Sequence, residues 1–157
     1  MKSKVKLSMY SSILTLVITG VILAGCIASY HEKTVFFTAL AILLMLIVSG
    51  LMYAPTAINA DPKYLTVCGL LKNRKIRMDD IENVELFQPT MGAIRLFASG
   101  GYMGYWGIFR EGDIGRYVAF YGKASDCFLV RLKNGDKYVL GCENPSAIVD
   151  YIKKQIL

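Results

Sequence analysis

Two long apolar runs near the N-terminus constrain this chain more than any other feature. The first run, residues 7–29, and the second, residues 34–60, contain no charged residue, and only Tyr30-His31-Glu32-Lys33 separates them. A helix needs about 20 apolar residues to cross about 30 Å of hydrocarbon, and each run is longer than that. We therefore predict a transmembrane helical hairpin over residues 1–54, with spans at about 9–29 and 35–53.

Basic residues near both ends of the hairpin predict its orientation. Three lysines precede the first span, and five basic residues follow the second within a short distance: Lys2, Lys4 and Lys6, then Lys63, Lys72, Arg74, Lys75 and Arg77. Short segments rich in Lys and Arg stay in the cytoplasm. We therefore expect both the N-terminus and the C-terminal domain on the cytoplasmic side of a bacterial inner membrane.

The charge balance of the C-terminal part bears on its partners. From residue 61 onward the chain has 14 basic and 11 acidic residues, which is a mild excess. No basic stripe or nucleic-acid-binding motif accompanies it, so nucleic acid is not expected as a partner. Weak attraction to anionic lipid headgroups is consistent with this balance.

Cys26 leaves two readings of the first span open. Leu23-Ala24-Gly25-Cys26 is similar to a bacterial lipobox, in which the cysteine is lipid-modified after cleavage of a signal peptide. The second apolar run begins within ten residues of Cys26, which favours an uncleaved hairpin in which small residues allow close helix packing. The other cysteines form no C-x-x-C pair and are expected to be reduced, buried thiols.

Short strand-like segments dominate the part after residue 54. Pro55 should end the second span at or before Ala54. We predict strands near 56–59, 64–68, 74–78, 84–87, 117–121, 128–132 and 137–141, with one helical turn at 79–81. Asn134-Gly135 predicts a type I′ hairpin turn, and Asn144-Pro145 predicts the start of a final amphipathic helix. The fold class is thus α+β, with an antiparallel sheet covered by a C-terminal helix.

Residues 89–115 are the exception to this regularity. They contain seven of the fourteen glycines and no clear period of helix or strand, so we expect a long, irregular loop. Its aromatic and basic residues are the candidate contacts with a membrane partner or lipid: Arg95, Tyr102, Tyr105, Trp106, Phe109, Arg110 and Arg116. Trp and Tyr favour the membrane–water interface. Core packing, a partner surface and direct lipid contact all remain open for these aromatics.

Residues 54–157 resemble the bacterial pleckstrin-homology-like (PH-like) domains. The segment that carries the resemblance is Arg74-Lys75-Ile76-Arg77-Met78-Asp79-Asp80-Ile81-Glu82-Asn83-Val84, a basic strand followed by an acidic turn and Ile-x-x-Val. The resemblance implies a strongly bent sheet closed by the final helix and used mainly for binding. Lys72, Lys75 and Arg77 match a phosphoinositide-binding pattern of eukaryotic relatives, but they lie between the wrong strands, so that activity is not predicted.

The sequence provides no catalytic or cofactor site. Its one histidine, His31, lies in the loop between the spans, and no nucleophile has a base partner and no His or Cys pair has metal-ligand spacing. We therefore predict a non-enzymatic PH-like interaction or assembly module, residues 55–157, anchored at the cytoplasmic face by the hairpin. Its expected partners are membrane lipids along the hairpin and a membrane protein or a second copy. Two alternatives remain: a lipid- or small-ligand-binding sensor, and an accessory subunit of a membrane enzyme or transporter.

Overall fold

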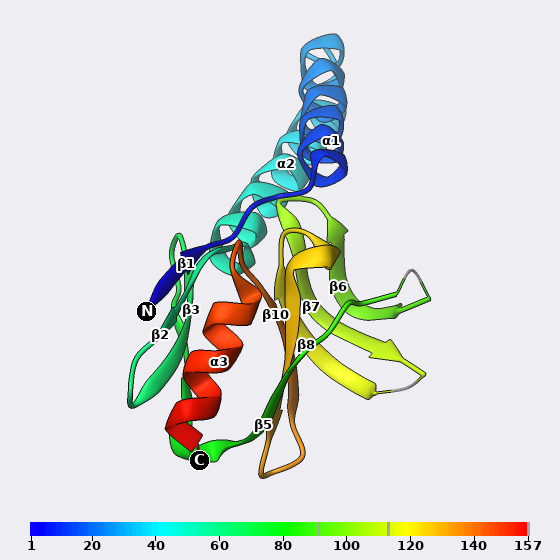
Figure 1. Cartoon of the computed structure of the whole chain (residues 1–157). Helices are drawn as coiled ribbons and strands as arrows, with labels where there is room; N and C mark the ends of the chain where they lie inside the picture. The colour runs from blue at the N-terminus through cyan, green and yellow to red at the C-terminus, as the bar shows by residue number, and fades with distance from the viewer. Residues whose placement is uncertain (91, 113, 157) are drawn as a thin grey trace.

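A helical hairpin projects from a domain of two β-sheets (Figure 1). The computed structural model describes residues 1–90, 92–112 and 114–156. Met91 and Asp113 of the predicted loop, and Leu157 at the end of the predicted domain, lie outside the described residues. The α+β class and the C-terminal helix that covers the sheet are confirmed.

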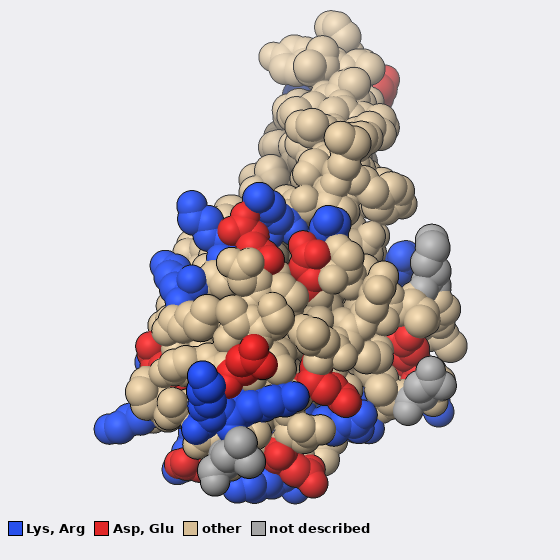
Figure 2. All heavy atoms as spheres, in the orientation of Figure 1, with Lys and Arg blue, Asp and Glu red and all other residues tan. Residues whose placement is uncertain are grey.

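The hairpin consists of α1 (Met9–Ala28) and α2 (Lys33–Tyr53). The side chain of Ser8 caps α1 by accepting a hydrogen bond from Ser11 N at 3.1 Å, and α2 ends at Tyr53, directly before Ala54-Pro55. Both helices are long and apolar enough to cross a membrane, and only 11% of each apolar window is buried. Because the apolar side chains face outward, the hairpin requires an apolar solvent. Figure 2 shows it as an almost uncharged column.

The residues before α1 pack on the folded domain as an N-terminal strap, residues 1–8. Its strand β1 (Lys2–Lys4) pairs antiparallel with β2 (Pro55–Ala60), which directly follows α2. Further along the strap, Lys6 Nζ lies 2.8 Å from Glu143 Oε1, and Ser8 N donates to Gly122 O at 2.9 Å. Both ends of the hairpin therefore lie at the same end of the molecule, against the folded domain. The predicted domain boundary at residue 54 assigns the strap to the hairpin, and the pairing of β1 with β2 was not predicted.

The strands form two sheets. One sheet has the order β1-β2-β3-β4 and the other β5-β9-β10-β8-β7-β6. The remaining strands are β3 (Tyr64–Gly69), β4 (Arg74–Arg77), β5 (Ile81–Leu86), β6 (Ile94–Gly101), β7 (Gly104–Glu111), β8 (Gly115–Tyr121), β9 (Cys127–Leu132) and β10 (Lys137–Gly141). Two 3₁₀ turns, Met78–Asp80 and Ala124–Asp126, join strands, and the first matches the predicted helical turn.

The main core lies between the two sheets and under α3 (Pro145–Ile156). Ile148, Val149 and Ile152 repeat at helical spacing, and all three are buried. They meet side chains of both sheets, among them Leu65 and Val84, each of which is fully buried. The predicted apolar face of the final helix is confirmed. This core covers β5, β9 and β10 and leaves part of β6, β7 and β8 uncovered.

The prediction of an irregular loop over residues 89–115 was wrong. Residues 94–111 form the β6–β7 hairpin, with Gly101 opposite Gly104. Gly101, Met103 and Gly104 all have positive φ, at 130°, 52° and 99°, which explains the glycines at this turn. Side chains on both faces of β7 are buried or half-buried, except that of Arg110, so the sequence does not alternate between apolar and polar.

Two further details differ from the prediction. The strands do not form a simple meander, because β10 returns between β9 and β8 and pairs parallel with β8. The Asn134-Gly135 hairpin forms as predicted, but its turn is not type I′. Of the two residues only Gly135 has positive φ, at 89°, and Gly135 N donates to Leu132 O at 2.9 Å. This is a type I turn followed by a left-handed glycine.

Strap pairing can be tested with a disulfide. Lys2 lies opposite Asn59, next to the pair in which Met1 and Ala60 exchange backbone hydrogen bonds. Because the two kinds of pair alternate along an antiparallel ladder, Lys2 and Asn59 form a non-hydrogen-bonded pair. The side chains of such a pair are the closer ones and lie within disulfide reach. We expect Lys2→Cys with Asn59→Cys to cross-link under mild oxidation, as detected by a gel shift that reductant reverses. Lys2→Cys with Lys63→Cys is the control, and equal cross-linking of both pairs would contradict the register.

Candidate interaction face at the base of the hairpin

The turn of the β6–β7 hairpin is bound to α1. We call residues 101–104 the β6–β7 tip. Ser11 Oγ donates to Gly101 O and accepts from Gly104 N, the latter at 3.0 Å. One helical turn further on, Thr15 Oγ1 accepts from Met103 N at 2.9 Å. Because Ser11 is fully buried, its hydroxyl provides the hydrogen-bond partners that water cannot provide to Gly101 O and Gly104 N.

Side chains of the tip extend this contact along the hairpin. Tyr102 Oη lies 3.4 Å from Thr19 Oγ1, two turns beyond Ser11. The side chain of Met103 packs against Gly50 of α2, where a Cβ would collide with it. Met103 is the one non-glycine residue among those described with positive φ, a conformation that most residues avoid. The tip is therefore held between the two helices.

Aromatic stacking joins α2 to the same sheet. The rings of Tyr53 and Trp106 stack with centroids 5.2 Å apart, and Trp106 Nε1 donates to Tyr102 O at 3.2 Å. The Arg74 guanidinium lies over the rings of both Tyr53 and Phe120, at 5.3 and 4.9 Å. The end of α2, the edge strand β4 and the strands β7 and β8 thus meet at one cluster.

Strand register defines an uncovered face on β6, β7 and β8. Cross-strand neighbours on one side of these strands form three rungs, which we call the three-rung face: Ser99–Trp106–Phe120, Phe97–Ile108–Val118 and Ile94–Arg110–Arg116. The first rung meets Tyr53 at the base of α2. Phe97 is 82% exposed and Ile94 is 62% exposed, so the part of this face on β6 carries apolar surface that the domain does not cover. On the other strands Phe120 is buried, and Trp106 and Val118 pack partly buried against the main core.

A shallow cavity lies at the membrane end of this face. Its volume is about 240 Å³, and it is lined by Tyr53, Arg74, Phe97, Trp106, Gly107, Ile108, Val118 and Phe120. Arg74, Arg110 and Arg116 border the face, and none of them forms an ion pair with a carboxylate among residues 1–90, 92–112 and 114–156. Near the hairpin the face is thus mainly apolar, with the Arg74 guanidinium stacked on the rings of Tyr53 and Phe120. At its far end it carries the pair Arg110 and Arg116.

The opposite side of the same strands is a second, smaller core. Tyr105 stacks on Tyr121, and Phe109 on Tyr117. Glu111 is buried and accepts hydrogen bonds from Thr90 N at 3.0 Å and from Tyr117 Oη at 3.3 Å. Burial, together with the nearby Glu111 carboxylate, raises the pKa of Tyr117 well above its ordinary value. The hydrogen bonds of Glu111 thus hold the segment before β6 against this side of the sheet.

The seven residues predicted as contacts fall into three groups. Tyr102 is buried at the tip and Phe109 in the second core, while Tyr105 and Trp106 are half-buried in stacks. The three arginines are exposed. Arg95 lies on the side of Phe109, and Arg110 and Arg116 lie on the three-rung face. The structure therefore does not bring all three arginines into one pocket.

Several residues of the site did not appear in the sequence-based prediction. Phe97 and Ile94 lie in the segment predicted as a loop, and Arg74 entered the prediction only as a sign of topology and as part of the family resemblance. Ser11, Thr15 and Thr19 did carry a signal, since they repeat at a spacing of four within an apolar helix. That spacing places them on one face, and polar side chains on one face of a membrane helix indicate a packing contact.

Cys26 lies at the far end of α1 and is buried. Cleavage before it would remove the strap and the seryl and threonyl groups that hold the tip. Of the other cysteines, Cys127 and Cys142 are buried and Cys68 is partly exposed, and none forms a disulfide in the structure. Burial raises the pKa of the Cys127 and Cys142 thiols.

Comparison with known families identifies the fold. A family described as bacterial PH domain matches residues 56–156, which is well over half of the chain and begins directly after the hairpin. The chain therefore belongs to the bacterial PH domain family, and its domain is of a class that serves binding. Comparison with curated proteins and with solved structures finds no significant match.

Removing the Ser11 hydroxyl should loosen the tip. Ser11→Ala leaves a buried carbonyl and a buried amide of the tip unpaired, which costs about 2 kcal/mol. We expect a lower melting temperature in detergent and faster hydrogen exchange at the Met103 and Gly104 amides. Ser12→Ala is the matched control, because Ser12 Oγ bonds only to Ser8 O within its own segment. Equal exchange in the two variants would show that the tip does not depend on Ser11.

The buried thiols should be unreactive in the folded protein. We expect maleimide to label Cys68 about tenfold faster than Cys127 or Cys142 between pH 7 and 9, because burial limits access and the raised pKa keeps these two thiols protonated. Site-resolved mass spectrometry of the full chain measures each rate. Labelling in denaturant, where the three should react alike, is the control, and equal rates without denaturant would contradict this burial.

Proposed function

We propose that this protein is a non-enzymatic interaction module anchored at the cytoplasmic face of a bacterial inner membrane. Its class supports this role, because PH-like domains mediate protein or lipid contacts. The orientation is supported by the basic residues at both ends of the hairpin. The strap and the tip contacts favour an uncleaved first span, because both are made by residues that precede Cys26.

The observation that carries the proposal is the double attachment of the domain to its hairpin. The strap pairs with β2 on one sheet, and the β6–β7 tip binds α1 from the other. The domain therefore cannot swing freely from a single linker. A module held in one orientation beside the bilayer has a high effective concentration for partners in the same membrane, and the three-rung face is then always presented beside the base of the hairpin.

Helix length supports a tip at the membrane surface. From Thr15 to Ala28 the helix rises about 20 Å, and from Lys33 to Gly50 about 26 Å, at about 1.5 Å per residue. The hydrocarbon core is about 30 Å thick. Each helix must therefore use nearly its whole length to cross the hydrocarbon core. The tip, which contacts the domain end of both helices, then lies in the interfacial layer. Tyr53, Tyr102 and Trp106 are residue types that favour this layer.

A small-ligand sensor is the second candidate function. The observation that favours it is a cavity of about 130 Å³ on the side of the second core, lined by Pro89, Thr90, Ala93, Arg95, Tyr105, Phe109, Tyr121 and Ala124. It combines one guanidinium with two phenol rings and suits a small anion. An accessory role in a membrane enzyme or transporter would use the three-rung face instead and is one form of the interaction module.

Site-specific photocrosslinking in living membranes tests the proposed function. A photoreactive amino acid at Phe97 or at Arg95 samples the two sides of β6, and one at Lys154 on α3 serves as the control. We expect protein adducts from β6, either with another membrane protein or with a second copy, and few from Lys154. Adducts with lipid or small molecules alone would favour the sensor and overturn the proposed function.

A further inference from the structure

We propose that the three-rung face binds a segment of a second membrane protein that is apolar where it leaves the bilayer and acidic about four residues further on. This inference rests on the proposed function and names the chemistry of its partner. The three-rung face has one end beside the membrane helix α2 and a defined order of side chains along its strands. Its outer residues, Ile94, Phe97, Arg110 and Arg116, are exposed.

Polarity along the strands gives the first argument. The first rung stacks on Tyr53, the last residue of α2. The third rung lies four residues along β7 from Trp106, which is about 14 Å at about 3.4 Å per residue. Between them is the apolar rung of Phe97, Ile108 and Val118. A chain that emerges next to α2 thus first meets apolar surface and the Arg74 guanidinium, which is already stacked on two rings, and meets the pair of arginines afterwards.

Charge gives the second argument. Arg110 and Arg116 are direct cross-strand neighbours on the same side of the sheet, and like charges in that position repel each other. No carboxylate among the described residues forms an ion pair with either of them. The one described acidic residue of β7, Glu111, is on the opposite side, where Thr90 and Tyr117 bind it. Two adjacent guanidinium groups that have no ion-pair partner among the described residues suit a carboxylate from outside.

The strand edge distinguishes a protein segment from a lipid. β6 is the last strand of its sheet, so its outer edge carries backbone groups that a further strand or an extended segment can bind. A lipid would have to bring its headgroup about 14 Å out of the leaflet to reach the third rung, which exposes acyl chain to water. A protein chain leaving a membrane helix covers that distance in four extended residues at no such cost.

A defined probe tests this polarity. The full chain is placed in neutral phosphatidylcholine nanodiscs with a synthetic peptide that has a span of about 20 leucines, then Val-Thr-Ile-Thr, then Glu-Asp-Glu. Energy transfer between a dye on the peptide and one at Asn134→Cys, in the β9–β10 turn of a chain that also carries Cys68→Ser, measures binding. Two matched probes carry Glu-Asp-Glu before Val-Thr-Ile-Thr, or Lys-Lys-Lys in place of the acidic residues.

We expect the first probe to bind about tenfold more tightly than either matched probe. Arg110→Glu with Arg116→Glu should remove this preference. Lys153→Glu with Lys154→Glu, which makes the same change in net charge on α3, should leave binding within about twofold of the unmodified chain. Both arginines are exposed, so the variant should fold. If it does not, Arg110→Gln with Arg116→Gln should still reduce the preference severalfold.

Three results would overturn the inference. One is equal binding of the first two probes, and another is equal loss in the two charge-reversal variants. The third combines two measurements. Probe binding is abolished in phosphatidylglycerol nanodiscs, and native mass spectrometry finds phosphatidylglycerol retained by the unmodified chain but lost from the arginine variant. This result would assign the face to lipid. In the first two cases the proposed function still stands if photocrosslinking from β6 captures a protein, so the two failures can be told apart.

Discussion

The hydrogen bonds between Ser11 and the β6–β7 tip are the interaction on which the arrangement of hairpin and domain depends. An isolated pair of membrane helices followed by a short linker would leave the domain free to turn. Here a buried hydroxyl satisfies a carbonyl and an amide of a strand turn from inside a mostly apolar helix. Because buried polar groups are costly when unpaired, the position of the tip depends on this side chain, together with the hydrogen bond to Thr15 and the packing of Met103 on Gly50.

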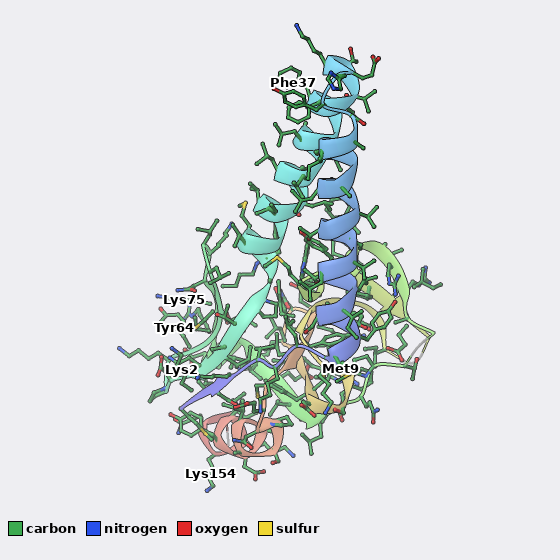
Figure 3. The ribbon with its side chains drawn as sticks, turned by 90° about the horizontal axis from the view of Figure 1, so that it is seen from above. Lys2, Met9, Phe37, Tyr64, Lys75 and Lys154 are labelled. Carbon is green, nitrogen blue, oxygen red and sulfur yellow. The ribbon has the colours of Figure 1, made fainter. Side chains whose placement is uncertain are left out.

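The strap and the tip act on different sheets, and this explains how a small domain gains a fixed orientation. β1 extends the sheet that follows α2, while the tip belongs to the sheet that carries α3 on its other half. The hairpin thus joins the two sheets at one end, while α3 runs lengthwise between them (Figure 1). Figure 3 shows the same relation from another side, with Lys2, Tyr64 and Lys75 at the sheet end and Phe37 at the far end of the hairpin.

The same geometry leaves the three-rung face exposed. The final helix has only 12 residues and covers the half of the sheet formed by β5, β9 and β10. Nothing among the described residues covers Phe97 and Ile94. A membrane-anchored chain can carry such a surface if a partner in the same membrane covers it, whereas a freely diffusing domain would risk aggregation. The apolar face and the anchor are therefore parts of one functional arrangement.

Local patterns predicted most of the elements but not the contacts between them. The spans, the end of α2 at Pro55, the β9–β10 hairpin and the apolar face of α3 each follow from a few neighbouring residues. The β6–β7 hairpin was missed because it has side chains packed on both faces: Trp106 stacks on a membrane helix, and Phe109 lies in a separate core. Neither partner is close in sequence, so the period of two was not visible.

By itself, the sequence determined that this chain has a membrane hairpin, a small α+β domain and a bacterial PH-like segment after it. These features depend on apolar length, turn residues and short motifs, which are local. Only the tertiary structure decided that Lys2–Lys4 form a strand, that Ser11 binds the tip, and that Arg110 and Arg116 border an apolar face while Arg95 does not. The first two depend on contacts between residues 53 to 93 positions apart. The third depends on strand register, and a one-residue shift in register would move every side chain to the other face.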